Sequence, residues 1–310
     1  MAEPALAIRG LSKFYSTTAA LRDFSVTVND GDVCALVGPN GAGKTTLINL
    51  LLGLTHPDSG SIAIYGHRAG SISARRHVGF LPDVPSFPGW MTAEEVLRLF
   101  LDLSGKSDHS VVHPLLDAVG LSGNSRPVRQ FSRGMKQRLG LAQALAGSPR
   151  LLVLDEPTSA LDPSGRRLFH EIIRSLRGRA TVLYSTHSLM EAESVCSSTI
   201  IVHEGQLIRH ATLDELIHEG QGLIVDVTGP VEALVDRLRS AHWVRSVATK
   251  SDYSRTRIFL TVTDLPTAQH DLLPLIIDTG ALLYSLEPRG LEDIFLEFTA
   301  SETLSNGGTP

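Results

Sequence analysis

The sequence predicts an α/β protein with a mainly parallel sheet that helices cover on both faces. In roughly the first two-thirds of the chain, short apolar runs that end in Gly, Pro or Asp alternate with stretches of helical periodicity. Such alternation is typical of parallel strands joined by helical crossovers. The predicted strands cover residues 33–37, 78–81, 151–154, 181–184 and 200–202, and the predicted helices cover 44–52, 92–103, 134–146 and 166–176.

The composition is that of an ordinary globular protein. Of 310 residues, 42% are hydrophobic, and 28 basic residues against 33 acidic ones give a net charge of −5, which argues against a broad nucleic-acid-binding surface. Cys34 and Cys196 are too few for a disulfide framework, so we expect a reducing compartment. We expect no signal peptide at Met1 and no membrane span, because no apolar run approaches the roughly 18–20 residues required.

A second, smaller region follows the polar, glycine-marked stretch 218–222. Pro274 is expected either to kink the second helix of this region or to mark its true start. The order βαββαβ resembles a ferredoxin-like unit, with a further helix after it. The pattern predicts strand 223–228, helix 231–240, strands 244–250 and 256–262, helix 267–279, strand 281–286 and helix 290–299, before a disordered tail at 301–310.

A phosphate-binding loop is predicted directly after the first of the parallel strands. Residues Gly38–Thr45 have the pattern G-x-x-x-x-G-K-[ST] between an apolar strand and a helix. Glycines let successive backbone N–H groups point at an anion, and the helix adds its positive N-terminal end. Lys44 can reach the β- and γ-phosphates of a nucleotide, and Thr45 offers a hydroxyl to Mg²⁺.

Two carboxylates follow the apolar strand 151–154. Asp155 stands where it can hold Mg²⁺, through water, as phosphate-loop enzymes require. Glu156 is the natural general base for a water that attacks the γ-phosphate. The simpler alternative is that both are solvated carboxylates at a strand end.

Three further segments accompany these motifs in a fixed order: residues 131–138 (FSRGMKQR), 159–162 (SALD) and 185–187 (STH). With the phosphate loop, they resemble the ATP-binding subunits of ABC transporters over about residues 5–217. The resemblance implies a P-loop ATPase with a mainly parallel core sheet, an antiparallel β subdomain and a helical subdomain. We accordingly expect an ATPase domain at 1–217 and an accessory α/β domain at 222–300.

The resemblance also implies roles for particular residues. Ser132 and Gly134 would contact ATP bound to an opposite subunit, and Asp162 would lie in the loop that communicates across the dimer. His187 would touch the γ-phosphate and position the water, and Tyr15 would stack on adenine, although Tyr15 as a lone aromatic could equally be core. The expected contacts of the phosphate loop are Gly38, Asn40, Gly41, Gly43, Lys44, Thr45 and Thr46.

Two departures from the family pattern stand out. Asp83 occupies the place where the family usually has Gln near the metal; its oxygen suits Mg²⁺, but its shorter side chain favours contact through water. The signature segment has Phe131, Arg133 and Met135 at its first, third and fifth places, where the family has Leu, Gly and Gln. Both changes resemble the bacterial subgroup of antibiotic and bacitracin exporters, as does the run Leu291–Leu296.

The resemblance further implies ATP and Mg²⁺ as cofactors, head-to-tail homodimers or heterodimers, and a separate membrane-spanning permease at the cytoplasmic face of the cell membrane. Nucleic acid is not expected as a partner. Phe87, Trp90 and Met91 are candidate contacts for the permease, with internal packing as the alternative for the last two. The rival functions are a soluble ABC ATPase that acts on ribosomes or DNA, and a P-loop small-molecule kinase.

Overall fold

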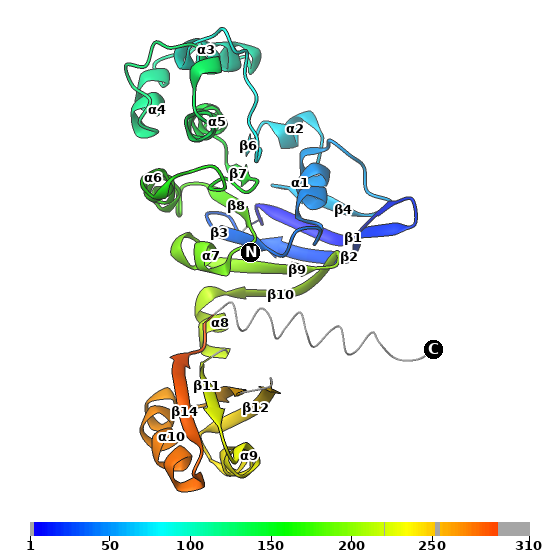
Figure 1. Cartoon of the computed structure of the whole chain (residues 1–310). Helices are drawn as coiled ribbons and strands as arrows, with labels where there is room; N and C mark the ends of the chain where they lie inside the picture. The colour runs from blue at the N-terminus through cyan, green and yellow to red at the C-terminus, as the bar shows by residue number, and fades with distance from the viewer. Residues whose placement is uncertain (1–2, 220, 252–254, 291–310) are drawn as a thin grey trace. The chain divides into compact units, whose positions relative to one another are not determined.

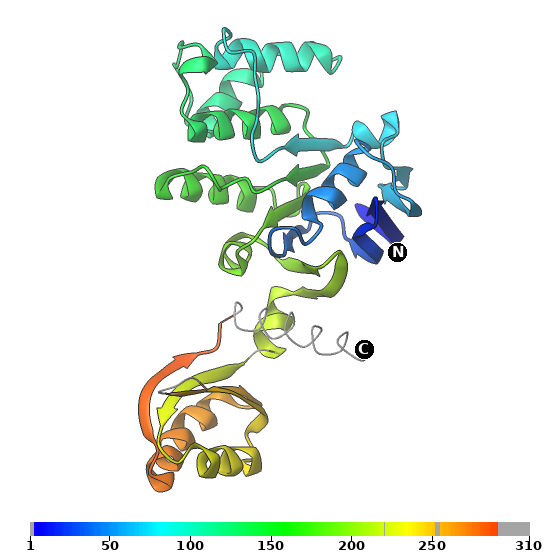
Figure 2. The ribbon, with the colours of Figure 1, turned by 45° about the vertical axis from the view of Figure 1, so that its right-hand side comes forward.

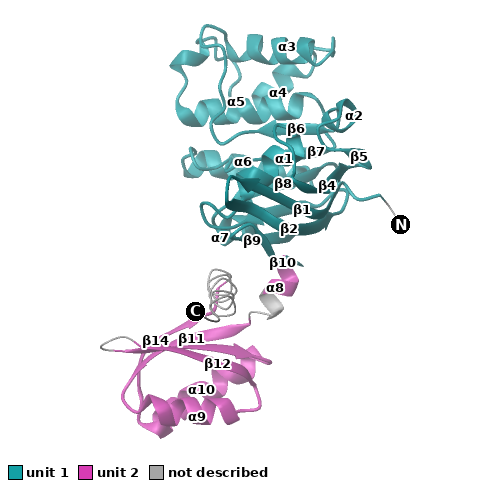
Figure 3. Ribbon diagram, turned by 90° about the vertical axis from the view of Figure 1, so that its right-hand side faces the viewer, with its two compact units in different colours: residues 1–212 teal, residues 213–310 magenta. Residues whose placement is uncertain are grey.

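The computed structural model describes residues 3–219, 221–251 and 255–290 (Figure 1). The chain divides into two compact units, residues 1–212 and residues 213–310 (Figure 3). The predicted helix 290–299, the run Leu291–Leu296 and the expected tail 301–310 lie outside the described residues, apart from residue 290. The first unit ends five residues before the predicted end of the ATPase domain at 217, because residues 213–219 form a helix that belongs to the second unit.

The core of unit 1 is a six-stranded sheet with the order β10-β9-β3-β8-β7-β6 (Figure 1). All neighbours are parallel except the edge strand β10, which runs antiparallel to β9. Strands β3 and β7 are buried along their whole length, as their unbroken apolar runs predict. The bounds are β3 (Val33–Val37), β6 (Val78–Leu81), β7 (Leu151–Leu154), β8 (Thr181–Thr186), β9 (Ser198–His203) and β10 (Gln206–Thr212).

Helices α1, α6 and α7 belong to this core, and α7 packs against β3 and β8. Helix α6 begins three residues earlier than predicted, because Asp162 accepts a hydrogen bond from the Gly165 N–H and Pro163 occupies the first turn. Helix α1 has its predicted bounds, and it ends at Gly53 in the left-handed conformation. The bounds are α1 (Lys44–Leu52), α6 (Pro163–Ser175) and α7 (Leu189–Val195).

An antiparallel sheet with the order β2-β1-β4-β5 completes the β structure of unit 1. Its apolar side chains, among them Leu11, Leu21 and Phe24, share one core cluster with β3 and α1. Periodicity did not predict these strands; only the family resemblance implied an antiparallel part. The bounds are β1 (Leu6–Tyr15), β2 (Thr18–Val28), β4 (Ser59–Ile64) and β5 (His67–Arg68), followed by the short helix α2 (Ile72–Arg75).

A helical region is inserted between β6 and β7 (Figure 2). Helix α3 starts at a complete capping box, in which Thr92 and Glu95 satisfy each other's backbone N–H groups. Helix α5 carries the signature segment at its N-terminus and packs against β6. The bounds are α3 (Ala93–Leu103), α4 (Val112–Ala118), the 3₁₀ turn η1 (Val128–Gln130) and α5 (Arg133–Ala146).

The described residues of unit 2 form an antiparallel sheet with the order β12-β13-β11-β14 and three helices. Helix α10 runs through Pro274, so this proline does not mark its start, and Trp243 is buried in the core of the unit. The bounds are α8 (Leu213–Glu219), β11 (Gly222–Thr228), α9 (Val231–Ser240), β12 (Val244–Ser251), β13 (Thr256–Val262), α10 (Leu265–Thr279) and β14 (Leu282–Pro288).

Across the described residues of both units, no helix combines the length and the apolar character that a bilayer span requires.

Candidate functional site

The candidate residues gather where four neighbouring parallel strands end. Val37 of β3 pairs with Thr186 of β8, and Leu154 of β7 pairs with Tyr184 of β8 and with Leu81 of β6. Because these strands run in the same direction, the residues that follow them emerge at one edge of the sheet. The sheet therefore brings together the phosphate loop after β3, the carboxylates after β7, His187 after β8 and Asp83 after β6.

The phosphate loop is closed tightly against its neighbours. A Cβ at Gly38 would lie 2.3 Å from the carbonyl oxygen of Val202, so no larger residue fits there. Gly43 has φ +107°, and its Cβ would lie 2.6 Å from the carbonyl oxygen of Ala20. Two of the predicted loop glycines are thus required by contacts and backbone conformation within this chain.

Lys44 is the first residue of α1 and is buried. Its ammonium donates hydrogen bonds to the carbonyl oxygens of Gly38 at 2.6 Å and Pro39 at 3.3 Å, so the loop holds its own cation. Thr45 and Asn40 are exposed at the rim of the loop, where their side chains can meet a ligand. A buried cation that stands in a glycine-rich loop at a helix N-terminus suits a polyphosphate.

Glu156 connects Lys44 with His187. Its Oε1 lies 3.5 Å from Lys44 Nζ, and its Oε2 lies 2.9 Å from His187 Nδ1. The Glu156 side chain is 20% exposed, whereas His187 is 62% exposed. Glu156 also adopts φ +44°, an uncommon backbone conformation for a residue with a side chain. The structure thus holds a half-buried carboxylate between a buried cation and an exposed imidazole.

Asp155 is buried beside Glu156 and is held by Ser185. The Ser185 hydroxyl donates to Asp155 Oδ1 at 2.7 Å and accepts the Glu156 backbone N–H at 2.8 Å. Burial raises the pKa of Asp155 above its ordinary value; the Ser185 hydrogen bond lowers it, while the charges of Glu156 and Asp83 raise it further. This role of Ser185 was not predicted from the sequence, in which the residue stands out only by its place at the end of a neighbouring parallel strand.

Asp83 is already engaged by other side chains. The Ser159 hydroxyl donates to its Oδ1 at 2.8 Å, and Arg133 Nη2 lies 3.5 Å from the same oxygen. Ser159 belongs to the loop after β7 and Arg133 to the first turn of α5. The two departures from the family pattern, Asp83 and Arg133, therefore contact each other.

The remaining candidates lie apart from this cluster. Within the described residues, no hydrogen bond or ion pair joins Ser132 or Gly134 to the phosphate loop; Ser132 instead caps α5 by accepting from the Met135 N–H. Asp162 caps α6, and hydrogen bonds from Ser164 and Gly165 hold its pKa below the ordinary value. Tyr15 is half exposed, with Lys13 Nζ 5.5 Å from its ring centroid.

The donor set suits Mg²⁺ with the phosphates of a nucleotide. Thr45 and Asp155 supply hard oxygen atoms, and Mg²⁺ typically uses one or two carboxylates, a hydroxyl and phosphate oxygens. In the part of the chain that the structure describes, no three His, Cys, Asp or Glu side chains could hold an ion alone. Thr45 and Asp155 therefore fit a Mg²⁺ ion that nucleotide phosphates also coordinate.

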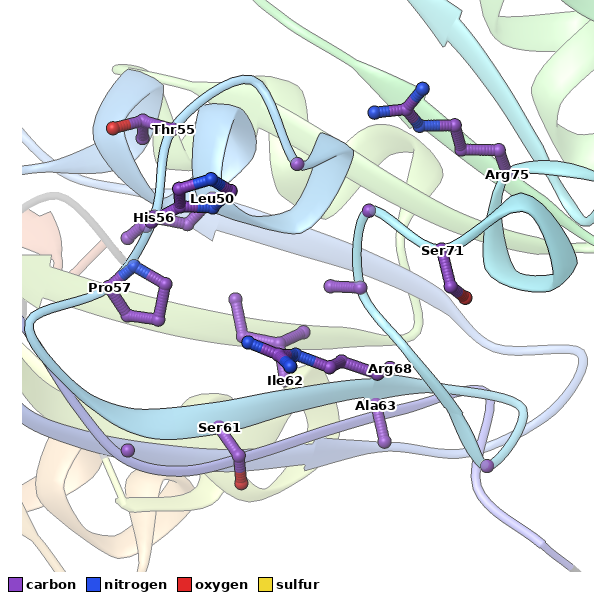
Figure 4. A pocket seen from close by; sticks show the side chains of 15 residues that line it. Leu50, Thr55, His56, Pro57, Ser61, Ile62, Ala63, Arg68, Ser71 and Arg75 are labelled. Carbon is purple, nitrogen blue, oxygen red and sulfur yellow. The ribbon is translucent and has the colours of Figure 1, made fainter.

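A cavity of about 730 Å³ elsewhere in unit 1 contains none of the candidate residues (Figure 4). It lies between the end of α1, strand β4 and the loop that leads to α2, and its lining includes Leu50, Ile62, Arg68 and Arg75. The chemistry predicted from the sequence therefore belongs to the strand ends and not to this cavity.

The fold and the site define a P-loop nucleotide-hydrolysing protein. Comparison with known proteins names the family: residues 21–159 match the ABC transporter model. The uncharacterized ABC transporter ATP-binding protein YxlF of Bacillus subtilis is 37% identical over 300 residues, which cover 94% of this chain and 98% of that protein. The chain therefore belongs to the ABC transporter family as an ATP-binding subunit, and its enzymatic activity is ATP hydrolysis.

Two further comparisons agree with this family assignment. The Nod factor export ATP-binding protein I of Burkholderia lata is 36% identical over 302 residues, which cover 95% of this chain and 96% of that protein. The solved structure of an ATP-binding subunit of an ABC transporter is 34% identical, with a TM-score of 0.64; the match covers 69% of this chain and 92% of that one. The resemblance to the family is thus confirmed along nearly the whole chain.

Proposed function

We propose that this protein hydrolyses ATP to drive export through a separate membrane subunit, with Glu156 as the general base. The observation that carries the proposal is the position of Glu156, whose carboxylate lies between Lys44 Nζ at 3.5 Å and His187 Nδ1 at 2.9 Å. A carboxylate beside the phosphate loop can take the proton of an attacking water, and His187 can orient that water and the γ-phosphate. Ser185 fixes the backbone of Glu156 and the carboxylate of Asp155 in this arrangement.

Nucleotide binding in this proposal rests on the phosphate loop. Lys44 neutralises the β- and γ-phosphates, Thr45 and Asp155 hold Mg²⁺, and the N–H groups of the loop bind phosphate oxygens. Bound Mg²⁺ would neutralise the charge that develops on the phosphates. Tyr15 is the proposed adenine contact, supported by its exposure and by its place at the end of β1.

Two copies complete each site in this proposal. Ser132 and Gly134 are part of the signature segment, yet they make no described contact with Lys44 or Glu156 of their own chain. A helix N-terminus with an exposed Ser is suited to bind the γ-phosphate of ATP held by a second subunit. Asp162 follows Ser159 in the loop that would lie at that contact. ATP then favours the closed dimer, and hydrolysis releases it.

The direction of transport is inferred from two features. The Burkholderia lata relative is named for Nod factor export. Asp83, Phe131, Arg133 and Met135 are departures from the general family pattern that resemble the bacterial antibiotic and bacitracin exporters. We place the protein at the cytoplasmic face of the cell membrane, held there by its permease partner. Trp90, which is 75% exposed, is a candidate contact for that partner.

Unit 2 is proposed to be a ferredoxin-like accessory domain for packing or dimerisation. Its element order βαββαβ and its antiparallel strand order β12-β13-β11-β14 support this assignment.

Sedimentation of Glu156→Gln tests the proposed function. Without its base, this variant should bind ATP and remain in the closed dimer, and the dimer should be absent without nucleotide. Lys44→Ala in the Glu156→Gln background is the matched control and should stay monomeric with ATP. A Glu156→Gln protein that binds ATP but remains monomeric would contradict the self-pairing part of the proposal.

A further inference from the structure

Glu191 lies in the first turn of α7, and two threonine hydroxyls hold its carboxylate. Thr158 Oγ1 donates to Glu191 Oε1 at 2.6 Å, and Thr186 Oγ1 donates to Glu191 Oε2 at 2.8 Å. Hydrogen bonds to a charged acceptor are short and strong. Within the described ranges, no Lys or Arg side chain pairs with Glu191, so its carboxylate is oriented by the two hydroxyls.

The two threonines belong to the segments that carry the proposed catalytic pair. Thr158 stands two residues after Glu156, in the loop after β7, and Thr186 is the last residue of β8 and directly precedes His187. Both threonine side chains are buried. From a third element, Glu191 therefore connects the segment of the carboxylate with the segment of the imidazole.

The threonines are held in turn by further donors. The buried Tyr184 hydroxyl donates to Thr158 Oγ1 at 3.3 Å, and the Ser188 backbone N–H donates to Thr186 Oγ1 at 3.0 Å. Burial raises the pKa of Tyr184, and the charge of Glu191 acts in the same direction, so the phenol remains a donor. Because each threonine oxygen accepts one of these donors, its own proton can point at the carboxylate, and the bonds form a continuous chain.

We propose that Glu191 is a positioning residue for ATP hydrolysis: through the two threonines, it fixes the segment of Glu156 relative to the segment of His187. The direct hydrogen bond of that pair is open to solvent, since His187 is 62% exposed, whereas the threonines of the second link are buried. A carboxylate suits this place because it accepts at both oxygens, while an amide accepts at one. The inference rests on the proposed function, in which the pair acts on the attacking water.

Steady-state ATP hydrolysis by the full chain tests this role. Glu191→Ala should lower kcat by roughly 10- to 100-fold, because a misplacement of about 1 Å can cost that much. The ATP affinity should stay within about twofold of the parent value, because the substitution does not touch the phosphate loop. Glu191→Gln keeps one acceptor and should lose less. Glu193→Ala, an exposed change in the same helix, is the matched control and should keep the parental kcat. A parental kcat in Glu191→Ala, or an equal loss of ATP affinity, would overturn the proposal.

The threonines show whether Glu191 acts through them. Thr158→Val and Thr186→Val each remove one hydroxyl and should lower kcat, whereas Thr158→Ser and Thr186→Ser retain the hydroxyl and should keep most of the rate. Glu191→Ala should cause no further loss in the double valine variant, because its two hydrogen bonds are already absent. Fully additive losses would overturn the link through the threonines.

Hydrogen exchange in the nucleotide-free full chain separates this inference from the proposed function. Glu191→Ala should accelerate exchange of peptides that cover residues 156–161 and 185–190 by roughly three- to tenfold, because both segments lose a hydrogen bond that holds them. Glu193→Ala should leave the same peptides unchanged, and unchanged exchange in Glu191→Ala would overturn the link. If Glu156→Gln hydrolysed ATP at the parental rate, the proposed base would be wrong, while the exchange experiment would still decide whether Glu191 holds the two segments.

Discussion

The Glu156 carboxylate and the His187 imidazole form a direct pair, with Oε2 and Nδ1 separated by 2.9 Å. They follow β7 and β8, which are neighbours in the parallel sheet. The pair exists because the sheet places the ends of these strands side by side, and Ser185 holds the Glu156 backbone N–H at 2.8 Å. The carboxylate is thereby held beside the phosphate loop, where it can accept a proton from water.

Glu156→Gln should reduce steady-state ATP hydrolysis by roughly 10²–10⁴-fold, because an amide cannot accept the proton of the attacking water. ATP affinity should change little, since the substitution is nearly isosteric. Phosphate release at saturating ATP measures the rate, and isothermal titration measures the affinity. Glu171→Gln, on the exposed side of α6, is the control and should hydrolyse ATP as the parent does. Turnover of Glu156→Gln close to the parent value would reject Glu156 as the base.

Lys44→Ala should weaken ATP binding by roughly 10- to 100-fold, because it removes a charged hydrogen-bond donor for the phosphates. Lys44 is buried and its ammonium is held by Gly38 and Pro39, so its orientation is set before ATP arrives. Titration with ATP measures the loss, and circular dichroism checks the fold. Lys250→Ala, an exposed change in β12, should not alter the affinity. An unchanged affinity in Lys44→Ala would remove Lys44 from the proposed binding role.

Gly140→Ala should lower the free energy of unfolding by about 1–3 kcal/mol, the usual cost of overpacking. A Cβ there would lie 2.5 Å from Leu81 Cδ1 and 3.2 Å from Pro85 Cβ, and Leu81 is fully buried. This cost should exceed the gain of up to about 1 kcal/mol in helix propensity. Gly147→Ala is the matched control, because the nearest atom to its Cβ is Lys106 Nζ at 4.0 Å. Urea denaturation measures the free energy of unfolding of both variants. If Gly140→Ala is as stable as Gly147→Ala, the packing argument is refuted.

Much of the core of unit 1 could be predicted because its signals are local. The strands 33–37, 78–81 and 151–154 and the helix 44–52 have the predicted bounds, since unbroken apolar runs and a phosphate-loop motif are read within a few residues. The start of α6 was signalled by Asp162 and Pro163, but apolar periodicity alone placed it three residues too late.

The features that could not be predicted from the sequence depend on contacts between distant segments. Strand β1 contains Gly10, and its register against β2 shifts several times. Its sequence therefore lacks the regular alternation of apolar and polar residues that would predict a strand. The role of Ser185 requires the pairing of β7 with β8, and the Asp83–Arg133 pair requires that α5 pack beside β6. The sequence could identify Asp83 and Arg133 as unusual residues, but only the fold shows that they meet.

The stability of unit 2 should fall in acid through Asp226. Asp226 is buried and accepts two hydrogen bonds from Arg257, from Nε and Nη2, each at 2.8 Å. The Arg257 hydrogen bonds hold the pKa of Asp226 below its ordinary value of about 3.8, and Ser285 acts in the same direction. Because the folded pKa is lower than the unfolded one, this contribution is fully present above the unfolded value. It is lost as the pH falls through the folded value.

Trp243 allows unit 2 to be followed separately within the full chain. The protein has two tryptophans, and Trp243 is buried in unit 2 while Trp90 is exposed in unit 1. In a Trp90→Phe background, urea unfolding monitored by fluorescence should therefore report on unit 2. Asp226→Asn should be less stable than its parent at pH 7, and the difference should shrink as the pH falls from about 5 toward 2, because both side chains are then neutral. A difference that stays constant over this range would show that the charge of Asp226 does not stabilise unit 2.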